Sequence, residues 1–269
     1  MDAENLPRTA LITGASAGIG ASFAHVFAAN GFDLVLTARR ADRLESLARE
    51  IAAKYGRRVH VVAADLADPG APAAIFDEIA DAGITVDALV NNAGYGLPGS
   101  FLDCTWAQHR DFLQVMVTAV ADLTRRFLPG MIARRYGRII NVASLAGLVP
   151  ATAGHTLYAA SKSLVVVFSQ SLALENLRHN VHVTALCPGF TYSEFHDVNG
   201  MRPEVSKLPR FMWMDADTVA RQGYRAVMAG RIVYVPGRLN AFMAVFTRVM
   251  PQWLILGVVK RFAKRFRRA

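Results

Sequence analysis

Short apolar runs alternate with longer amphipathic stretches along most of this chain. The apolar runs predict strands at 10–13, 34–38, 59–63, 88–91, 138–142, 181–186 and 232–235. The Ala-rich stretches between them predict helices over 19–30, 42–55, 71–82, 105–136, 157–179 and 215–228. Strands that are apolar throughout are typical of parallel sheets buried on both faces, and strand–helix–strand order gives right-handed crossovers. We therefore predict an α/β fold with a doubly wound, seven-stranded parallel sheet and helices on both of its faces.

Two segments, 145–156 and 189–208, lack a regular pattern. Both follow predicted strands, and ligands of open α/β sheets bind beyond the carboxyl ends of the strands. We expect both segments to act as substrate loops within one domain over 1–237. Residues 238–269 are then an apolar and basic extension of the same domain.

The composition fits a folded globular protein with a large core, since 53% of the residues are hydrophobic and 19% are charged. Cys104 and Cys187 are too few for a disulfide framework and lack metal-ligand spacing, so we expect a reducing compartment and no metal. The first residues are acidic rather than basic, which is unlike a signal peptide. These features predict a cytoplasmic protein.

The net charge of +9 is confined to one end of the chain. Residues 231–269 hold nine Lys and Arg and no acid, so the first 230 residues sum to zero. The protein is a neutral domain with a cationic end, and we expect no nucleic-acid partner.

A glycine-rich loop follows the first predicted strand and opens the first predicted helix. Its candidate coenzyme contacts are Gly14, Ser16, Gly18, Ile19 and Gly20. Glycines permit a tight turn and a close approach of the backbone to a pyrophosphate, and the helix N-terminus offers free N–H groups. The alternative is an ordinary glycine turn.

The second predicted strand ends in Thr37-Ala38-Arg39-Arg40. An acid at the place of Arg39 would bind a ribose 2′-hydroxyl, whereas a guanidinium binds a 2′-phosphate through charge-assisted hydrogen bonds. This favours NADP(H) over NAD(H) as the cofactor. The alternative is that Arg39 is a solvated loop charge.

Six short motifs together identify a resemblance: TGASAGIG at 13–20, AADL at 63–66, NNAG at 91–94, NVAS at 141–144, YAASK at 158–162 and CPG at 187–189. Their kind and order resemble the short-chain dehydrogenase/reductase family. The resemblance implies a Rossmann-type fold and reversible hydride transfer between a nicotinamide and a carbonyl or hydroxyl carbon. It also implies a homodimer or homotetramer assembled through the helices predicted at 105–136 and 157–179.

Tyr158, Lys162 and Ser144 form the expected catalytic group. Tyr158 and Lys162 are four residues apart, so they share one helix face. A phenol ionises near pH 10, and we expect the nearby ammonium to lower the pKa of Tyr158 so that it serves as a general acid and base. Ser144 follows a strand and would hydrogen-bond the substrate oxygen. By resemblance, Lys162 also binds the nicotinamide ribose; the alternative for Tyr158 is a packing aromatic.

The resemblance extends coenzyme binding to further residues. They are Asp65 and Leu66 beside the adenine, Asn92, Ala93 and Gly94 along the coenzyme, Pro188 and Gly189 at the nicotinamide, and Thr191 and Ser193 at its carboxamide. Family members usually carry threonine where Ser193 stands, and the hydroxyl is retained.

Met116 falls where the family commonly has an asparagine that links the lysine to solvent through a water molecule. A thioether is only a weak acceptor and no donor. Either the proton takes another route or turnover is slowed; we expect an active enzyme, because Ser144, Tyr158 and Lys162 are all present. His155 precedes Tyr158 in the first irregular segment, where it either orients a polar substrate group or faces solvent.

The carboxyl-terminal segment is apolar and then strongly basic. Its apolar pieces are shorter than the roughly 20 residues that cross a bilayer. Ile255, Val259, Phe262 and Phe266 are spaced along one helical face among Lys and Arg, which is typical of a helix bound at an anionic membrane surface. The alternative is that this segment covers the substrate cleft or a partner subunit.

Two functions are compatible with the sequence. The first is an NADP(H)-dependent oxidoreductase that interconverts a carbonyl and an alcohol on a lipophilic small molecule: an oxoacyl chain, a steroid-like ring or a xenobiotic ketone or aldehyde. The second is a membrane-associated NADP(H)-binding regulatory or scaffold protein, with weak catalysis because of Met116.

Overall fold

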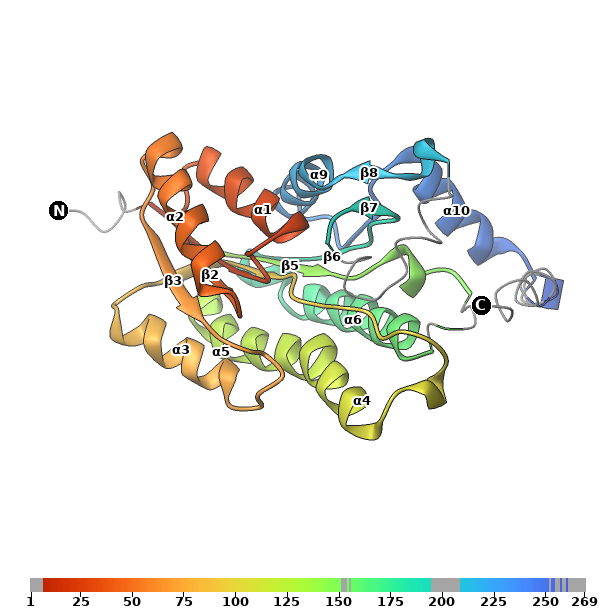
Figure 1. Cartoon of the computed structure of the whole chain (residues 1–269). Coiled ribbons are helices and arrows are strands. Elements are labelled where there is room, and N and C mark those ends of the chain that lie inside the picture. The colour runs from red at the N-terminus through yellow and green to blue at the C-terminus, as the bar shows by residue number, and fades with distance from the viewer. Residues whose placement is uncertain are drawn as a thin grey trace.

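The computed structural model describes residues 7–150, 154, 156–194, 209–251, 253, 254, 257 and 260. Its centre is a sheet of seven parallel strands in the order β3-β2-β1-β4-β5-β6-β9, which confirms the predicted fold class (Figure 1). The strands are β1 (Thr9–Thr13), β2 (Asp33–Ala38), β3 (Val59–Ala63), β4 (Val86–Asn91), β5 (Gly137–Val142), β6 (Val181–Leu186) and β9 (Val233–Tyr234).

Helices cover both faces of this sheet. Figure 1 shows α1 (Gly18–Ala29), α2 (Ala41–Tyr55) and α9 (Ala216–Met228) above it, and α3 (Ala71–Asp81), α4 (Trp106–Leu113), α5 (Ala119–Ala133) and α6 (Thr156–Glu175) below. Every residue of β1 and β5 is buried, as expected for central strands of a parallel sheet that is covered on both faces. Phe23 and Phe27 of α1 fill the upper half of the core, and Ile75 of α3 and Phe127 of α5 belong to the lower half.

The helix predicted over 105–136 is three elements rather than one. A π-helical segment, Gln114–Thr118, separates α4 from α5. It contains Met116, which is buried with its sulfur against Gly94: a Cβ added at Gly94 would lie 2.9 Å from the Met116 sulfur. Continuous apolar periodicity does not reveal such a π-helical widening, so no boundary could be predicted there.

Several short elements were not predicted because two or three residues carry no periodicity. Two-residue strands β7 (Thr191–Tyr192) and β8 (Met214–Asp215) pair with each other in parallel. Short 3₁₀ helices lie at Phe101–Asp103, Leu145–Gly147, Leu177–His179 and Arg210–Met212. A further helix, α10 (Arg238–Val249), starts directly after β9 and Gly237.

The strand order reverses between β1 and β4, and this switch point defines the crevice in which such sheets bind ligands. The loops after β1, β4, β5 and β6 all meet there. His155, residues 151–153 and 195–208, and the predicted helical face of Ile255, Val259, Phe262 and Phe266 lie outside the described residues.

Candidate active site

A long groove runs across the carboxyl ends of the central strands. Of the predicted catalytic and coenzyme-binding residues, Gly20 alone is absent from its lining. The others line it together: Gly14, Ser16, Gly18, Ile19, Arg39, Asp65, Leu66, Asn92, Ala93, Gly94, Ser144, Tyr158, Lys162, Pro188, Gly189, Thr191 and Ser193. A Cβ at Gly20 would collide with the Gly14 carbonyl and the Asn92 side chain, so Gly20 allows the loop to pack closely on the helix.

The glycine-rich loop has a backbone conformation suited to an anion. Gly14 and Gly18 have φ angles of 66° and 56°, in the left-handed region that favours glycine. α1 begins at Gly18, and its N-cap residue, Ala17, makes no side-chain capping hydrogen bond. The first N–H groups of α1 therefore open toward the groove with the positive end of the helix dipole. These features fit the pyrophosphate of a dinucleotide coenzyme.

The NNAG segment after β4 is fastened to the strand that precedes the glycine-rich loop. The backbone N–H groups of Asn92 and Ala93 both donate to the Thr13 hydroxyl at 2.9 Å. The Asn92 side chain donates to the Thr13 carbonyl at 3.0 Å. These bonds join the two sides of the switch point, so the coenzyme-binding loops are held in a fixed relation.

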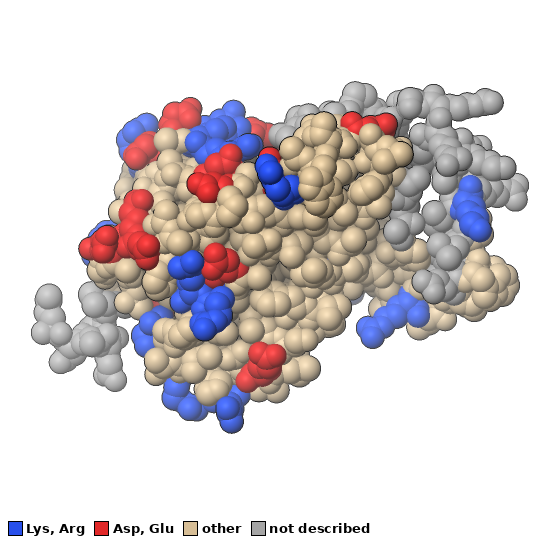
Figure 2. Space-filling model, turned by 90° about the horizontal axis from the view of Figure 1, so that it is seen from below, with Lys and Arg blue, Asp and Glu red and all other residues tan. Residues whose placement is uncertain are grey.

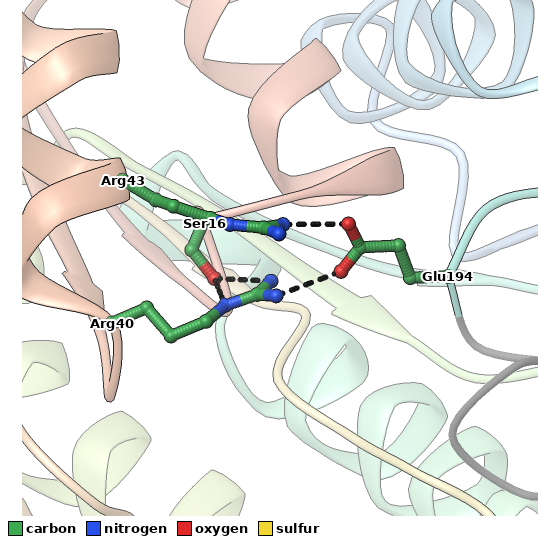
Figure 3. Close-up of polar contacts among 4 residues, drawn as sticks. All are labelled: Ser16, Arg40, Arg43 and Glu194. Atoms are coloured by element: carbon green, nitrogen blue, oxygen red, sulfur yellow. Dashed lines mark hydrogen bonds and ion pairs between the residues drawn. The ribbon is translucent and has the colours of Figure 1, made fainter.

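The end of the groove between the glycine-rich loop and the start of α2 is strongly polar (Figure 3). Arg39 is exposed at its edge, and Arg40 donates to the Ser16 hydroxyl, with distances of 3.0 and 3.3 Å from Nη2 and Nε. Glu194 accepts from Arg40 at 2.9 Å and from Arg43 at 2.6 Å. Sequence reasoning missed Arg40, Arg43 and Glu194. The adjacent basic pair was a signal for Arg40, but no motif brings Glu194 to this place.

Lys162 lies at the floor of the groove. It is buried, and its Nζ donates to the Val142 carbonyl at the end of β5, at 2.7 Å. Burial lowers the pKa of Lys162 from 10.5 to about 8, and the neighbouring Cys187 thiol opposes this shift. The Nζ atom lies 5.8 Å from the centre of the Tyr158 ring, so the two side chains share one wall, as their spacing predicts.

Tyr158 differs from the expectation in its acidity. Burial raises the pKa of the phenol, and a hydrogen bond with Ser144 partly offsets that rise. The expectation of a lowered pKa for Tyr158 is therefore wrong for this structure, because removal of the phenol from water is the largest effect on it. A phenol with a raised pKa stays protonated near neutral pH, which suits donation of a proton to a carbonyl oxygen.

Ser144 is oriented by its own loop. It follows β5 and caps the 3₁₀ helix Leu145–Gly147, where its hydroxyl accepts from the Ala146 N–H at 3.1 Å. Its hydroxyl oxygen is thereby fixed beside Tyr158. The two hydroxyl groups form a pair that can contact one substrate oxygen.

α10 contributes a wall of the groove, which agrees with the alternative that the carboxyl-terminal segment covers a cleft. Asn240 and Met243 line the groove, and the Asn240 amide donates to the Pro236 carbonyl at 2.9 Å. A Cβ at Gly189 would lie 2.6 Å from the Asn240 amide nitrogen, so the loop after β6 packs tightly on this helix. The carboxyl-terminal region is thus part of the site.

Comparisons with known proteins agree with this arrangement. The short chain dehydrogenase family model matches residues 8–201. Oxidoreductase UcpA of Escherichia coli strain K12 is 40% identical over 184 residues, covering 68% of this chain and 69% of that protein.

Solved structures give the same result. A short-chain dehydrogenase from Sphingobium yanoikuyae in complex with NADPH has a TM-score of 0.79 and 30% identity, covering 91% of this chain and 96% of that one. L-Sorbose reductase from Gluconobacter frateurii, complexed with NADPH and L-sorbose, has a TM-score of 0.75 and 28% identity, covering 87% of this chain and 97% of that one.

The chain therefore belongs to the short-chain dehydrogenase/reductase family and is an NAD(P)-dependent oxidoreductase. The groove described above contains both the glycine-rich loop and Tyr158.

Proposed function

We propose that the protein is an NADP(H)-dependent oxidoreductase that interconverts a carbonyl and an alcohol on a lipophilic small molecule. The observation that carries this proposal is the hydrogen-bonded pair of Ser144 and Tyr158 with buried Lys162 beside it, in the groove that also contains the glycine-rich loop.

Each of these side chains has a distinct task. In reduction, the Tyr158 hydroxyl donates its proton to the carbonyl oxygen, and Ser144 hydrogen-bonds the same oxygen as negative charge develops on it. Lys162, held by the Val142 carbonyl, binds the nicotinamide ribose and stabilises the tyrosinate after proton transfer. When bound, the coenzyme supplies the hydride in reduction and accepts it in oxidation.

The preference for NADP(H) rests on the cluster of basic residues after β2. Arg39 and Arg40 line the groove where a 2′-phosphate is recognised in dinucleotide-binding folds. The two solved structures named above are NADPH complexes. In the same arrangement Asp65 and Leu66 contact the adenine, Gly94 and Pro188 lie along the nicotinamide half, and Thr191 and Ser193 bind the carboxamide.

The substrate class follows from the side chains around Tyr158. A small pocket next to Tyr158 is walled by Leu97, Phe101, Phe112 and Leu157. The larger groove adds further apolar walls, among them Tyr95, Val115, Leu145, Val149 and Met243. Such surroundings favour an oxoacyl chain, a steroid-like ring or a xenobiotic ketone or aldehyde over a highly charged substrate.

A homodimer or homotetramer is proposed from the lower face of the molecule. Leu164, Val167 and Leu174 of α6 are exposed, and their spacing places them on one side of the helix. Figure 2 shows that a broad area in the middle of the face below the sheet carries no Lys, Arg, Asp or Glu. An apolar, uncharged face of this kind is typical of a subunit interface.

Peripheral membrane association is proposed from α10. Phe242, Val245, Phe246 and Val249 are exposed on one face of this helix, opposite the side that lines the groove. Residues 231–269 contain Lys and Arg but no acid, which complements an anionic lipid surface. With α10 bound at an anionic lipid surface, the protein would act in the cytoplasm, at the inner face of the membrane.

α6 is also long and apolar enough to span a bilayer. It packs on β5 and β6 and carries the buried Lys162, so it is a core helix.

The test is consumption of NADPH or NADH by the full-length protein with a panel of lipophilic ketones and aldehydes. We expect turnover with NADPH on at least one aliphatic or ring ketone. Tight NADPH binding with no turnover on the whole panel would contradict the enzymatic proposal and favour the regulatory or scaffold function.

A further inference from the structure

A carboxylate lies among the arginines at the adenosine end of the groove. Glu194 contacts Arg40 through one oxygen and Arg43 through the other, at 2.9 and 2.6 Å (Figure 3). All three side chains are less than half exposed, at 41 to 45%. The hydrogen bonds from Arg43 and Arg40 hold the pKa of Glu194 below its usual range, so it is an anion at neutral pH.

The backbone fixes Glu194 in this position. It stands two residues after β7, which pairs with β8, and the ring of Tyr192 in β7 stacks on Trp213 at 4.8 Å. The intervening Ser193 lies close over the glycine-rich loop, since a Cβ at Gly18 would be 2.9 Å from the Ser193 Cβ. Glu194 therefore reaches across the groove from the loop after β6 to the start of α2.

A 2′-phosphate and Glu194 would compete for the same donors. Arg40 also donates to Ser16, so its guanidinium is directed at the place between the glycine-rich loop and the end of β2. A phosphate monoester carries up to two negative charges near neutral pH and prefers the same forked donors as a carboxylate. Binding it requires Glu194 either to release the guanidinium groups or to remain close to a second anion.

We propose that Glu194 is a coenzyme-specificity residue that weakens binding of 2′-phosphorylated coenzyme by competing for Arg40 and Arg43. It limits the preference for NADP(H) that the arginines create, and it leaves the affinity for NAD(H) unaffected. This inference rests on the proposed coenzyme site and adds a residue of opposite effect to it.

The experiment is a fluorescence titration of the full-length protein with NADPH and, separately, with NADH. The variant is Glu194→Gln, which removes the charge and keeps an oxygen that can accept a hydrogen bond. We expect NADPH to bind about three- to tenfold more tightly to this variant, as the loss of two partly exposed ion pairs implies, and NADH to change less than about twofold. The difference should shrink as salt is raised, because the competing charges are exposed.

Glu45→Gln is the matched control, because it removes the same charge from an exposed position on α2 that does not line the groove. It should leave both affinities unchanged. Unchanged or weaker NADPH binding to Glu194→Gln would overturn the inference. If the native protein bound NADH as tightly as NADPH, the proposed coenzyme preference would fail instead; the effect of Glu194→Gln on NADPH would still decide the role of Glu194.

Discussion

At the scale of a single residue, burial of the Lys162 ammonium in the groove lowers the free energy of unfolding. An ammonium buried with one carbonyl partner has lost most of its hydration, which is why its pKa falls to about 8. Between pH 8 and 10.5 the folded protein binds fewer protons than the unfolded chain. Folding is therefore penalised by Lys162 below pH 8, and the penalty disappears as the pH rises toward 10.5.

Replacement of Lys162 by Met should stabilise the coenzyme-free protein while abolishing turnover. The shift from 10.5 to about 8 corresponds to a penalty of about 3 kcal/mol at pH 7. Loss of the hydrogen bond to Val142 offsets about 1 kcal/mol of that gain. Urea unfolding at pH 7 and pH 10 measures the difference, and the gain should be clearly smaller at pH 10. A stability difference that is independent of pH would show that burial of the ammonium is not the cause.

Arg39 should determine part of the affinity for the 2′-phosphate. Substitution by Ala removes a charge-assisted contact, so we expect KM for NADPH to rise about tenfold and KM for NADH to stay within about twofold. Arg49→Ala is the control, since Arg49 is exposed on α2 away from the groove. An equal rise in both KM values would mean that Arg39 supports the loop rather than the phosphate.

Residues in local motifs could be predicted from the sequence, and residues brought together by the fold could not. The glycine-rich loop and the Tyr158–Lys162 pair are encoded by spacing within one turn or one helix. Glu194 and Arg40 are 154 positions apart in the sequence, so no local sequence pattern indicates that they are in contact. The predicted direction of the pKa shift of Tyr158 was wrong for a similar reason, because the burial of its phenol depends on the surrounding elements.

At the scale of elements, the π-helical segment Gln114–Thr118 determines where the Met116 side chain lies. The Met116 side chain is buried, and its sulfur lies beside Gly94, which lines the groove. A thioether cannot donate a hydrogen bond, so a proton relay from Lys162 to solvent cannot pass through Met116. We therefore expect the proton that resupplies Tyr158 to take another route.

Met116→Asn should leave turnover within about threefold of the native value. It should also lower the free energy of unfolding by about 1–3 kcal/mol, because it buries an amide where a thioether packs. Met116→Leu is the apolar control and should cost less stability. A many-fold rise in turnover with Asn would show that the native proton supply is impaired at Met116.

The long elements were predictable because their periodicity is strong, and the exceptions have physical causes. Six of the seven sheet strands extend at least five residues, and all were anticipated within two residues at each end. Strands β7 and β8, with two residues each, and the π-helical interruption were not. α10 was anticipated as an apolar segment that either binds a membrane or covers the substrate cleft. Its bounds were not predicted, and its inward face depends on the contact between Asn240 and Gly189.

At the scale of the whole molecule, α10 connects the active-site groove with the cationic end of the chain. One side of the helix lines the groove and the other exposes a row of apolar side chains. A lipophilic substrate in a membrane would then be close to the groove when α10 is at the surface.

This arrangement predicts binding to vesicles of phosphatidylcholine with phosphatidylglycerol, and weaker binding to phosphatidylcholine alone. Phe246→Asp should reduce binding by removing apolar burial and adding a negative charge. Leu102→Asp, an exposed apolar residue on a different element, is the control. Absence of sedimentation with either vesicle would contradict membrane association.

The role of Tyr158 as proton donor is tested most directly by the steady-state rate of NADPH oxidation with a lipophilic ketone, measured for the native protein and for Tyr158→Phe. We expect the variant to lose 10²- to 10⁴-fold in kcat and still to bind NADPH, because only the proton donor is removed. Tyr55→Phe, at the end of α2, should keep the native rate. Retention of native kcat by Tyr158→Phe would contradict the assignment of Tyr158 as the general acid.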